Sequence, residues 1–242
     1  MRYFIALVFS LCLIHTASAQ EMKPEETEVW DPEPAVVTPG MNGAAPSDAI
    51  VLFDGSSLDG WQHADGSAVK WKLEDGAMVA QKGAGDVFTK QKFGSAQIHI
   101  EWRTPAEVVG ESQGRGNSGI FLQGVYELQV LDSYNNRTYS NGQAGSIYKQ
   151  TMPLVNASKG PGEWQTYDII YHAPTFNSGH EYETNPYITV FHNGILIQDH
   201  TKIQGTTPYI GLPKVNQHGD GPLRLQDHSN PTAFRNIWIR KL

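Results

Sequence analysis

The sequence predicts an all-β domain in which two antiparallel sheets pack face to face. Short runs of aromatic and β-branched residues recur between glycine-rich turn signals from residue 48 onward, and no window keeps a helical periodicity. Asn193 and Gly194 separate two such runs, and both residue types tolerate the positive φ that a two-residue hairpin requires. Many strands without helices favour a sandwich, and residues 48–242 supply about one domain's length of chain.

Each expected strand rests on one of three patterns. In chain order the strands cover residues 50–53, 70–73, 77–81, 96–104, 119–123, 126–131, 167–172, 188–192, 195–199, 223–226 and 234–241. The first three, together with 167–172 and 234–241, are short aromatic or β-branched runs between turn signals. The strands that begin at 96, 119, 126 and 223 alternate with a period of two residues, and the Asn-Gly hairpin joins 188–192 to 195–199.

The segment 116–134 carries the clearest alternation and the first indication of a site. Apolar side chains point one way from its two strands: Ile120, Leu122, Tyr126, Leu128 and Val130. The opposite face carries amides, a carboxylate and an aromatic ring: Asn117, Phe121, Gln123, Glu127 and Gln129. An ordinary solvent face favours Thr, Lys and Ser. This set is suited to binding a hydroxylated ligand, and the segment is therefore a candidate site.

Two further strands extend this polar face if they lie beside it. Ile98, Ile100 and Trp102 alternate with polar residues along 97–103, and Leu223 and Leu225 do so along 223–228. We assume that all the apolar faces enter one core and that these strands are neighbours in one sheet. The outward residues then form a single surface: Glu101, Arg103, Asn117, Phe121, Gln123, Glu127, Gln129, Arg224, Gln226 and His228.

The N-terminal residues are expected to lie outside the folded domain. Residues 1–19 combine Arg2, an apolar run and the small residues Ala17-Ser18-Ala19, which is the pattern of a secretory signal peptide cleaved after Ala19. We therefore expect a periplasmic or secreted bacterial protein with no stable membrane span after signal removal. Cys12 leaves with the signal, and the mature chain can form no disulfide. Residues 20–47, rich in proline and acidic groups, are expected to form a mobile linker, with a tail packed along the domain as the alternative.

The charge of the chain excludes one class of partner. The net charge is −7, of which residues 20–47 carry −5 and residues 48–242 only −3. Because the chain has no basic patch or Lys/Arg run, nucleic acid is not an expected partner. The oligomeric state is left open.

An ordered series of motifs resembles the 3-keto-disaccharide hydrolase family. The motifs, in chain order, are LFDGSSLDGW at 52–61, WKLEDGAMVA at 71–80, GNSGIFLQG at 116–124, YELQVLDSY at 126–134, GSIYKQ at 145–150, PGEWQTYDI at 161–169, HNGILIQD at 192–199, LQDH at 225–228 and FRNIWIRKL at 234–242. The resemblance covers nearly all of the chain from Ile50 onward. It implies a concanavalin A-like, jelly-roll β-sandwich. It also implies a substrate oxidised at C3 of a sugar ring, a 3-keto-glycoside or 3-keto-disaccharide, that is cleaved by hydrolysis or by elimination followed by hydration.

Such chemistry requires a base near C2, a proton donor near the glycosidic oxygen and a group that polarises the ketone. Glu127 and His228 are the residues of the expected face that exchange protons near neutral pH, and Arg103 or Arg224 would stabilise an enolate oxygen. We take Glu127, His228 and Arg103 as candidate catalytic residues. The candidate substrate-binding residues are Asn117, Phe121, Gln123, Gln129, Tyr148, Arg224 and Gln226.

A divalent cation bound by the ketone and a neighbouring hydroxyl is a further option, because Glu127, Gln129 and His228 offer oxygen and nitrogen ligands. No cofactor is assigned, since no tight ligand-spacing motif is present. The competing interpretations are structural. Glu127 could pair with Arg103, and Asn117 could be present only because its backbone turn favours asparagine. Asp132 and Asp227 fall on the inward side, where we expect a capping role for Asp132 and an orienting role or an Arg235 partner for Asp227.

Two other functions are compatible with the same surface. A non-catalytic carbohydrate-binding module would use a polar face with an aromatic ring equally well, because a sandwich fold does not decide function. A weaker alternative is a cell-surface adhesion or scaffold domain tethered by the acidic linker.

Overall fold

The computed structural model describes residues 21–242 and divides them into two units, residues 21–36 and the compact unit 37–242. The expected signal peptide falls on residues that lie outside the described range. In the first unit, a short 3₁₀ helix, η1 (Pro24–Thr27), precedes Trp30, whose indole N–H donates to Glu28 at 3.1 Å. Among the described residues, no helix is long and apolar enough to cross a membrane.

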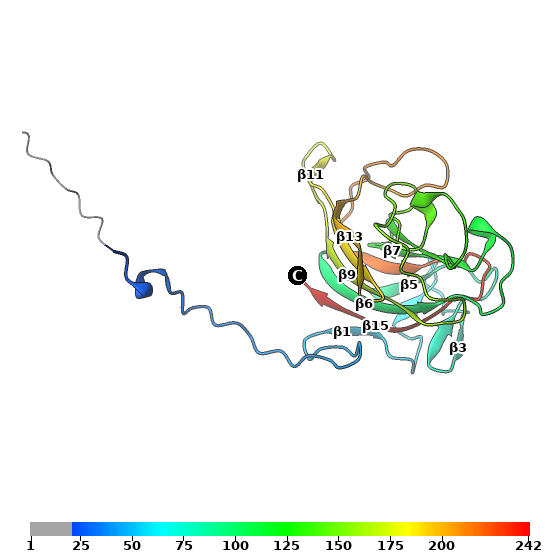
Figure 1. Ribbon diagram of the computed structural model, residues 1–242, viewed down its shortest axis with the longest axis horizontal. Helices are drawn as coiled ribbons and strands as arrows, with labels where there is room; N and C mark the ends of the chain where they lie inside the picture. The colour runs from blue at the N-terminus through cyan, green and yellow to red at the C-terminus, as the bar shows by residue number, and fades with distance from the viewer. Residues whose placement is uncertain (1–20) are drawn as a thin grey trace, which may run out of the picture. The chain divides into compact units, whose positions relative to one another are not determined.

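The compact unit is built from two antiparallel sheets. The eight-stranded sheet runs in the order β13 (Ile195–Lys202), β12 (Tyr187–His192), β9 (Gln165–His172), β6 (Ala96–Arg103), β15 (Ala233–Lys241), β4 (Ala77–Val79) and β3 (Lys72–Glu74), with β1 (Ile50–Phe53) also paired to β15. The five-stranded sheet runs β2 (Trp61–Gln62), β5 (Val87–Phe93), β14 (Gly221–Leu225), β7 (Asn117–Leu122) and β8 (Tyr126–Leu131). Figure 1 shows β6, β9 and β15 in one layer and β5 and β7 in the other.

The core lies between the two layers, where the predicted alternation places the apolar side chains. Ile98, Ile100 and Trp102 of β6 are fully buried, as are Ile120 and Leu122 of β7. The expected sandwich of two antiparallel sheets is therefore confirmed, and most strand bounds differ from the expected ones by one to three residues.

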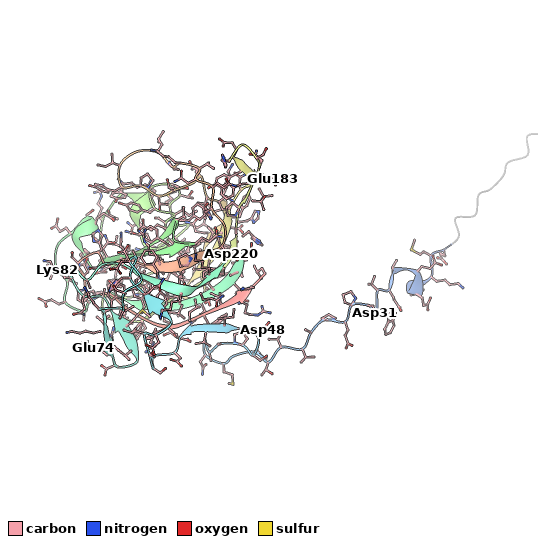
Figure 2. All side chains as sticks on the ribbon, turned by 180° about the vertical axis from the view of Figure 1, so that it is seen from behind. Asp31, Asp48, Glu74, Lys82, Glu183 and Asp220 are labelled. Carbon is pink, nitrogen blue, oxygen red and sulfur yellow. The ribbon has the colours of Figure 1, made fainter. Side chains whose placement is uncertain are left out.

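Several elements were not expected from the sequence. β5 joins β2 to β14, but its exposed run Lys90-Gln91-Lys92 interrupts the alternation that would reveal a strand. A small ribbon of β10 (Thr175–Phe176) and β11 (Tyr182–Thr184) occupies the long connection before β12, and Glu183 lies on it (Figure 2). Two further 3₁₀ helices, η2 (Ser112–Gly114) and η3 (Ser140–Gly142), lie in loops.

The assumption that all the polar strands share one sheet is wrong for β6. β6 lies between β9 and β15 in the eight-stranded sheet, whereas β7, β8 and β14 are neighbours in the five-stranded sheet. Glu101 and Arg103 therefore face away from the polar surface of β7 and β8. Since apolar residues of both sheets enter the same core, alternation alone cannot assign a strand to one layer.

Loops cover the outer face of the five-stranded sheet, and every residue of β7 and β8 is buried. Residues 145–148 extend the sheet along the free edge of β8, where Gly145 N donates to Gln129 O at 2.9 Å and Tyr148 N to Glu127 O at 3.1 Å. In Figure 1 the loops after β6, β8 and β13 lie on the same side of β7, away from β6 and β15. A face that would otherwise be open to solvent is thereby enclosed.

Residues 37–47 contact the outer face of the eight-stranded sheet. Trp238 Nε1 and Asn236 Nδ2 both donate to Gly43 O, at 2.8 and 2.9 Å. Asp48, which precedes β1 (Figure 2), binds the guanidinium of Arg240 through Oδ1 and Oδ2 at 2.6–2.9 Å. The linker role expected for residues 20–47 stays a prediction.

Candidate functional site

A cavity of about 610 Å³ lies on the covered outer face of the five-stranded sheet. Strands β7, β8 and β14 form its floor, and the loops form its walls. The lining residues are Gln113, Gly114, Asn117, Phe121, Glu127, Gln129, Tyr148, Thr207, Tyr209, Arg224, Gln226 and His228. Eight of the ten predicted site residues are in this set, namely all but Arg103 and Gln123.

A glycine makes room for the carboxyl group of Glu127. Gly119 of β7 lies opposite Gln129 of β8, two pairs away from the Phe121–Glu127 pair and on the same face. A Cβ at Gly119 would lie 2.5 Å from Glu127 Oε1 and 2.8 Å from Phe121 Cε2, closer than real Cβ contacts allow. The absence of a side chain at residue 119 therefore determines where the Glu127 carboxyl lies.

Glu127 is buried, and no cationic side chain of the described residues donates a hydrogen bond to its carboxyl. It is 6 % exposed, and the nearer terminal atom of the Gln129 amide lies 3.1 Å from its Oε1. Burial raises the pKa of Glu127 to about 8; the charge of Arg224 opposes this shift and that of Asp86 adds to it. A carboxyl with this pKa carries its proton at neutral pH and can donate it.

Three side-chain amides lie beside Glu127. Gln113 Nε2 donates to Gly142 O at 2.9 Å, and Asn117 Nδ2 donates to the Gln113 backbone carbonyl at 2.9 Å. Gln129 Nε2 donates to Gln113 Oε1 at 3.0 Å and lies 3.4 Å from Asn117 Oδ1. The three amides are thus linked to one another in this wall of the cavity. The side chain of Asn117 takes part in these contacts, so its role is not limited to the backbone turn.

Arg224 supplies the positive charge of the cavity. Its guanidinium carbon lies 3.6 Å from the centre of the Phe121 ring, so the two side chains stack. Its Nε lies 3.0 Å from Asp86 Oδ2 but makes no aligned hydrogen bond. The ion pair therefore holds the guanidinium by charge and leaves its donors available to a ligand.

Tyr148 comes to the site through the strand extension described above. Its hydroxyl lies 2.7 Å from that of Tyr139, and burial raises the pKa of Tyr148 far above its usual value. Lys149 Nζ lies 4.3 Å from the centre of the Tyr209 ring and donates to the Tyr209 carbonyl. This contact fastens the loop after β13 to the wall that carries Tyr148.

The remaining lining groups come from the loop after β13 and from the end of β14. Thr207 Oγ1 accepts the Glu127 backbone N–H at 3.2 Å. His228 is exposed at the cavity and Gln226 is half-buried. Asp227 accepts Gly85 N at 3.0 Å and Ser229 N at 2.9 Å. Asp227 thus orients the backbone around it, which was one of the two roles expected for it. It is not the partner of Arg235, which donates to Glu101 instead.

Arg103 and Gln123 do not line the cavity. Arg103 lies on β6 in the other sheet, and its guanidinium carbon is 4.7 Å from the centre of the Trp164 ring. It is therefore not a partner of Glu127. Gln123 follows β7 in a turn with φ 49°, which ends the alternation. Its Oε1 accepts the hydroxyl of Tyr171, a β9 residue, at 2.6 Å.

Four lining residues were not found from the sequence: Gln113, Gly114, Thr207 and Tyr209. All four lie in loops or in the short helix η2, where no periodicity assigns a side chain to a face. Asp132 behaves as expected, since its Oδ1 accepts Tyr134 N at 3.2 Å and its Oδ2 accepts Arg115 Nε at 2.9 Å.

A second buried charge cluster occupies the outer face of the other sheet. His99 Nδ1 donates to Asp168 Oδ1 at 2.6 Å, and Glu101 accepts Asn236 Nδ2 at 2.8 Å and Arg235 Nε at 2.7 Å. Burial opposes the charge of His99, but its hydrogen bond to Asp168 and its ion pair with Glu101, at 3.8 Å, outweigh this and raise its pKa to about 9. Burial likewise opposes the charge of Glu101, but the nearby His99 and the hydrogen bonds from Asn236 and Arg235 lower its pKa to about 2.

Within residues 21–242, no three His, Cys, Asp or Glu side chains are grouped as metal ligands. Glu127 and His228 both line the cavity, as the cation option requires, and Gln129 lies beside them.

A family model and solved structures match the chain. The model of the 3-keto-alpha-glucoside-1,2-lyase-like domain matches residues 48–240. One solved structure, described as a putative glycosyl hydrolase from Parabacteroides distasonis ATCC 8503, is 56% identical with a TM-score of 0.88. The match covers 91% of this chain and 97% of that chain. No curated protein matches the sequence.

Two more distant structures from the same organism share the fold. Both are described as putative glycosyl hydrolases, and both have TM-scores of 0.56. One is 22% identical and covers 81% of this chain and 94% of its own; the other is 21% identical and covers 80% and 99%.

Proposed function

Because the chain belongs to the family of 3-keto-alpha-glucoside-1,2-lyase-like domains, we propose that it cleaves 3-keto-glycosides in the cavity around Glu127. The family and the glycosyl hydrolase neighbours support a carbohydrate-acting enzyme. One observation carries the finer proposal: a buried carboxyl, whose pKa burial raises to about 8, shares a cavity with an exposed imidazole and a guanidinium. Its volume of about 610 Å³ lies within the usual range for small-ligand sites.

The first step of the proposed reaction is an elimination. The C3 ketone acidifies the hydrogen on C2, because the resulting carbanion is an enolate. His228 takes this proton, and Arg224 stabilises the negative charge on the C3 oxygen. The C1–O bond then breaks as a C1–C2 double bond forms, and Glu127 gives its proton to the departing oxygen. The free alcohol leaves, and an unsaturated 3-keto sugar stays in the cavity.

The second step adds water and restores the protein. Glu127, now a carboxylate, takes a proton from a water molecule while the oxygen of that water bonds to C1. His228 returns its proton to C2, so both groups regain their starting states. The sum of the two steps is hydrolysis of the glycosidic bond. Asn117 and Gln226 hold ring hydroxyls, and Phe121 and Tyr148 border the sugar.

The test compares one glucoside with its 3-keto form. The purified full chain is incubated with each in D₂O, and release of the alcohol is followed by chromatography. We expect cleavage of the oxidised compound alone, with deuterium entering C2 of the sugar product. Cleavage of the unoxidised glucoside at an equal rate, or no turnover on several 3-keto-glycosides, would contradict the proposal. Saturable binding of an unoxidised glycan without turnover would favour a carbohydrate-binding module instead.

Paired variants test the assignment of residues. His228→Ala should lower kcat about 10²- to 10⁴-fold, the usual contribution of a general base. Arg103→Gln is the matched control, because Arg103 lies on the other sheet against Trp164. Unchanged turnover in His228→Ala would remove this residue from the mechanism without affecting the substrate class.

We further propose that the protein is exported, on the signal-peptide pattern of residues 1–19. Expression of the full chain in a bacterium, followed by fractionation and intact mass measurement, tests this. A periplasmic or secreted product that begins at Gln20 is expected. A cytoplasmic product that retains residues 1–19 would contradict the proposal.

A further inference from the structure

The three amides beside Glu127 have fixed orientations that bear on the proton of this carboxyl. A side-chain amide that faces a backbone carbonyl must present its nitrogen, because a carbonyl oxygen only accepts. Gln113 faces Gly142 O at 2.9 Å, and Asn117 faces the Gln113 backbone carbonyl at 2.9 Å. Each amide nitrogen is thus assigned, and the oxygens Gln113 Oε1 and Asn117 Oδ1 point the other way.

Both of these oxygens point at Gln129. The atom of Gln129 that they meet lies 3.0 Å from Gln113 Oε1 and 3.4 Å from Asn117 Oδ1, so it must be the amide nitrogen. Gln129 Oε1 then lies 3.1 Å from Glu127 Oε1. Two oxygens at this distance form a hydrogen bond only if one carries a proton, and an amide oxygen does not.

The opposite orientation of Gln129 is less favourable. It would let the nitrogen donate to Glu127 at 3.1 Å and to Ser118 O at 3.3 Å. It would also turn the Gln129 oxygen toward two acceptors, Gln113 Oε1 at 3.0 Å and Asn117 Oδ1 at 3.4 Å, whose own orientations are set by backbone carbonyls. The first orientation leaves a single acceptor contact that no proton relieves, between Gln129 Oε1 and the Ser118 carbonyl oxygen at 3.3 Å. Gln129 is 1 % exposed and Asn117 3 %, so water does not relieve the contact between these two side chains.

We propose that Gln113, a residue of η2, is a positioning residue that acts through Gln129 to keep the proton on Glu127. The chain runs from Gly142 O to Gln113, then to Gln129 and then to Glu127, and each amide is oriented by the one before it. Ionisation of Glu127 requires Gln129 to rotate its amide and to break its hydrogen bond with Gln113. This inference adds to the proposed function the means by which the acid of the site is kept neutral.

Other charged and titratable groups surround Glu127, but none completes a hydrogen bond to its carboxyl in the described structure. These groups are Arg224 on β14, Asp86 before β5, His228 after β14, and Tyr139 and Tyr148 in the loop after β8. The Gln129 amide is therefore the group whose orientation distinguishes the two protonation states of Glu127.

The test measures the pKa of Glu127 in the full chain without substrate, by ¹³C NMR of labelled glutamate carboxyls. Gln113→Met removes the acceptor, so that Gln129 can rotate and donate to an ionised Glu127. We expect the pKa of Glu127 to fall by about one to two units, as a charge-assisted hydrogen bond to the carboxylate would cause. Gln113→Glu keeps an acceptor and adds negative charge, so it should raise the same pKa.

Opposite shifts separate this role from a structural one, because a general loosening of the loop would move both variants the same way. Gln143→Met is the matched control, since the Gln143 side-chain oxygen has no hydrogen-bond partner among residues 21–242. It should leave the pKa of Glu127 unchanged. An unchanged pKa in Gln113→Met, or shifts of equal sign in the two variants, would overturn the inference.

A neutron structure of the unmodified chain gives a direct second readout. It should show deuterium between Glu127 and Gln129 Oε1, and the Gln129 nitrogen toward Gln113. A Gln129 nitrogen that faces Glu127 would overturn the inference. Neither the NMR titration nor the neutron structure involves turnover. The inference can therefore fail while the proposed function stands, and the proposed function can fail while the inference stands.

Discussion

Glu127 and Glu101 are both buried, on strands of opposite sheets, yet their surroundings give them opposite charge states. Glu101 accepts hydrogen bonds from Asn236 and Arg235, and its pKa is lowered to about 2. In the described part of the chain no donor completes a hydrogen bond to the Glu127 carboxyl, which has the Gln129 amide at 3.1 Å, and burial raises the pKa of Glu127 to about 8. Burial sets the cost of a charge, whereas the neighbouring donors decide whether the charge forms. The first arrangement stabilises a charge within the fold, and the second is the one that we propose to be reactive.

The largest expected effect is the difference between the two pKa values themselves. With one value near 8 and the other near 2, the two carboxyls differ by about a million-fold in proton affinity. A ¹³C titration of both glutamates in one sample measures this difference. Glu101→Gln and Glu127→Gln assign the signals. If the two carboxyls titrate within one pH unit of each other, their surroundings do not give them opposite charge states, and the comparison fails.

The next effect is on stability as a function of pH. The folded pKa of Glu127 exceeds its unfolded value of 4.5, so the folded state binds more protons between pH 4.5 and 8. Stability of the wild type therefore falls as pH rises through this window. Glu127→Gln removes this loss. At pH 9 its free energy of unfolding should exceed that of the wild type by an amount on the order of 4 kcal/mol, and the difference should vanish near pH 4.

Denaturant unfolding of both proteins across this pH range makes the measurement. A stability difference that does not change with pH would mean that Glu127 is ionised in the folded protein at neutral pH.

Loss of the other glutamate should act in the opposite direction. Glu101→Ala leaves His99 and Arg235 without their shared carboxylate, so we expect a loss of about 3 kcal/mol in the free energy of unfolding. Folded molecules should keep their turnover, because the cluster lies on the other sheet. Denaturation at pH 7 gives the first quantity, and kcat per folded molecule gives the second. A stable variant with reduced kcat would connect this cluster to the site.

The smallest effect concerns the space in which Glu127 lies. Gly119→Ala introduces a Cβ that would lie 2.5 Å from Glu127 Oε1, so the carboxyl must move. We expect a loss of about 2 kcal/mol in stability and about a tenfold fall in kcat. Gly114→Ala is the matched control, because Gly114 also lines the cavity and its Cβ would meet nothing within 4 Å. Equal behaviour of the two variants would mean that Gly119 does not position Glu127.

The sequence predicted the sandwich and most of the cavity floor for the same reason. Alternation along 116–134 separates Ile120 and Leu122 from Asn117 and Glu127, and a strand fixes these directions locally. It could not tell which sheet a strand joins, and Arg103 was therefore assigned to the wrong face. Gln123 was misplaced because its positive φ ends the alternation one residue early.

The walls of the cavity could not be predicted in this way. Gln113 and Thr207 come from loops whose positions depend on contacts between distant parts of the chain. The hydrogen bonds between Ser112 and Asn136, at 2.9 and 3.0 Å, and that from Glu127 N to Thr207 Oγ1, at 3.2 Å, join residues 24 and 80 positions apart. No local pattern reports such contacts.

The central claim is that Glu127 donates a proton in the cleavage of a 3-keto-glycoside, whereas Glu101 does not. Turnover of one 3-keto-glucoside by Glu127→Gln and Glu101→Gln, counted per folded molecule at pH 7, tests it most directly. Glu127→Gln should lose about 10²- to 10⁴-fold in kcat, and Glu101→Gln should stay close to the wild-type rate. A Glu127→Gln variant that turns over as fast as the wild type would contradict the claim.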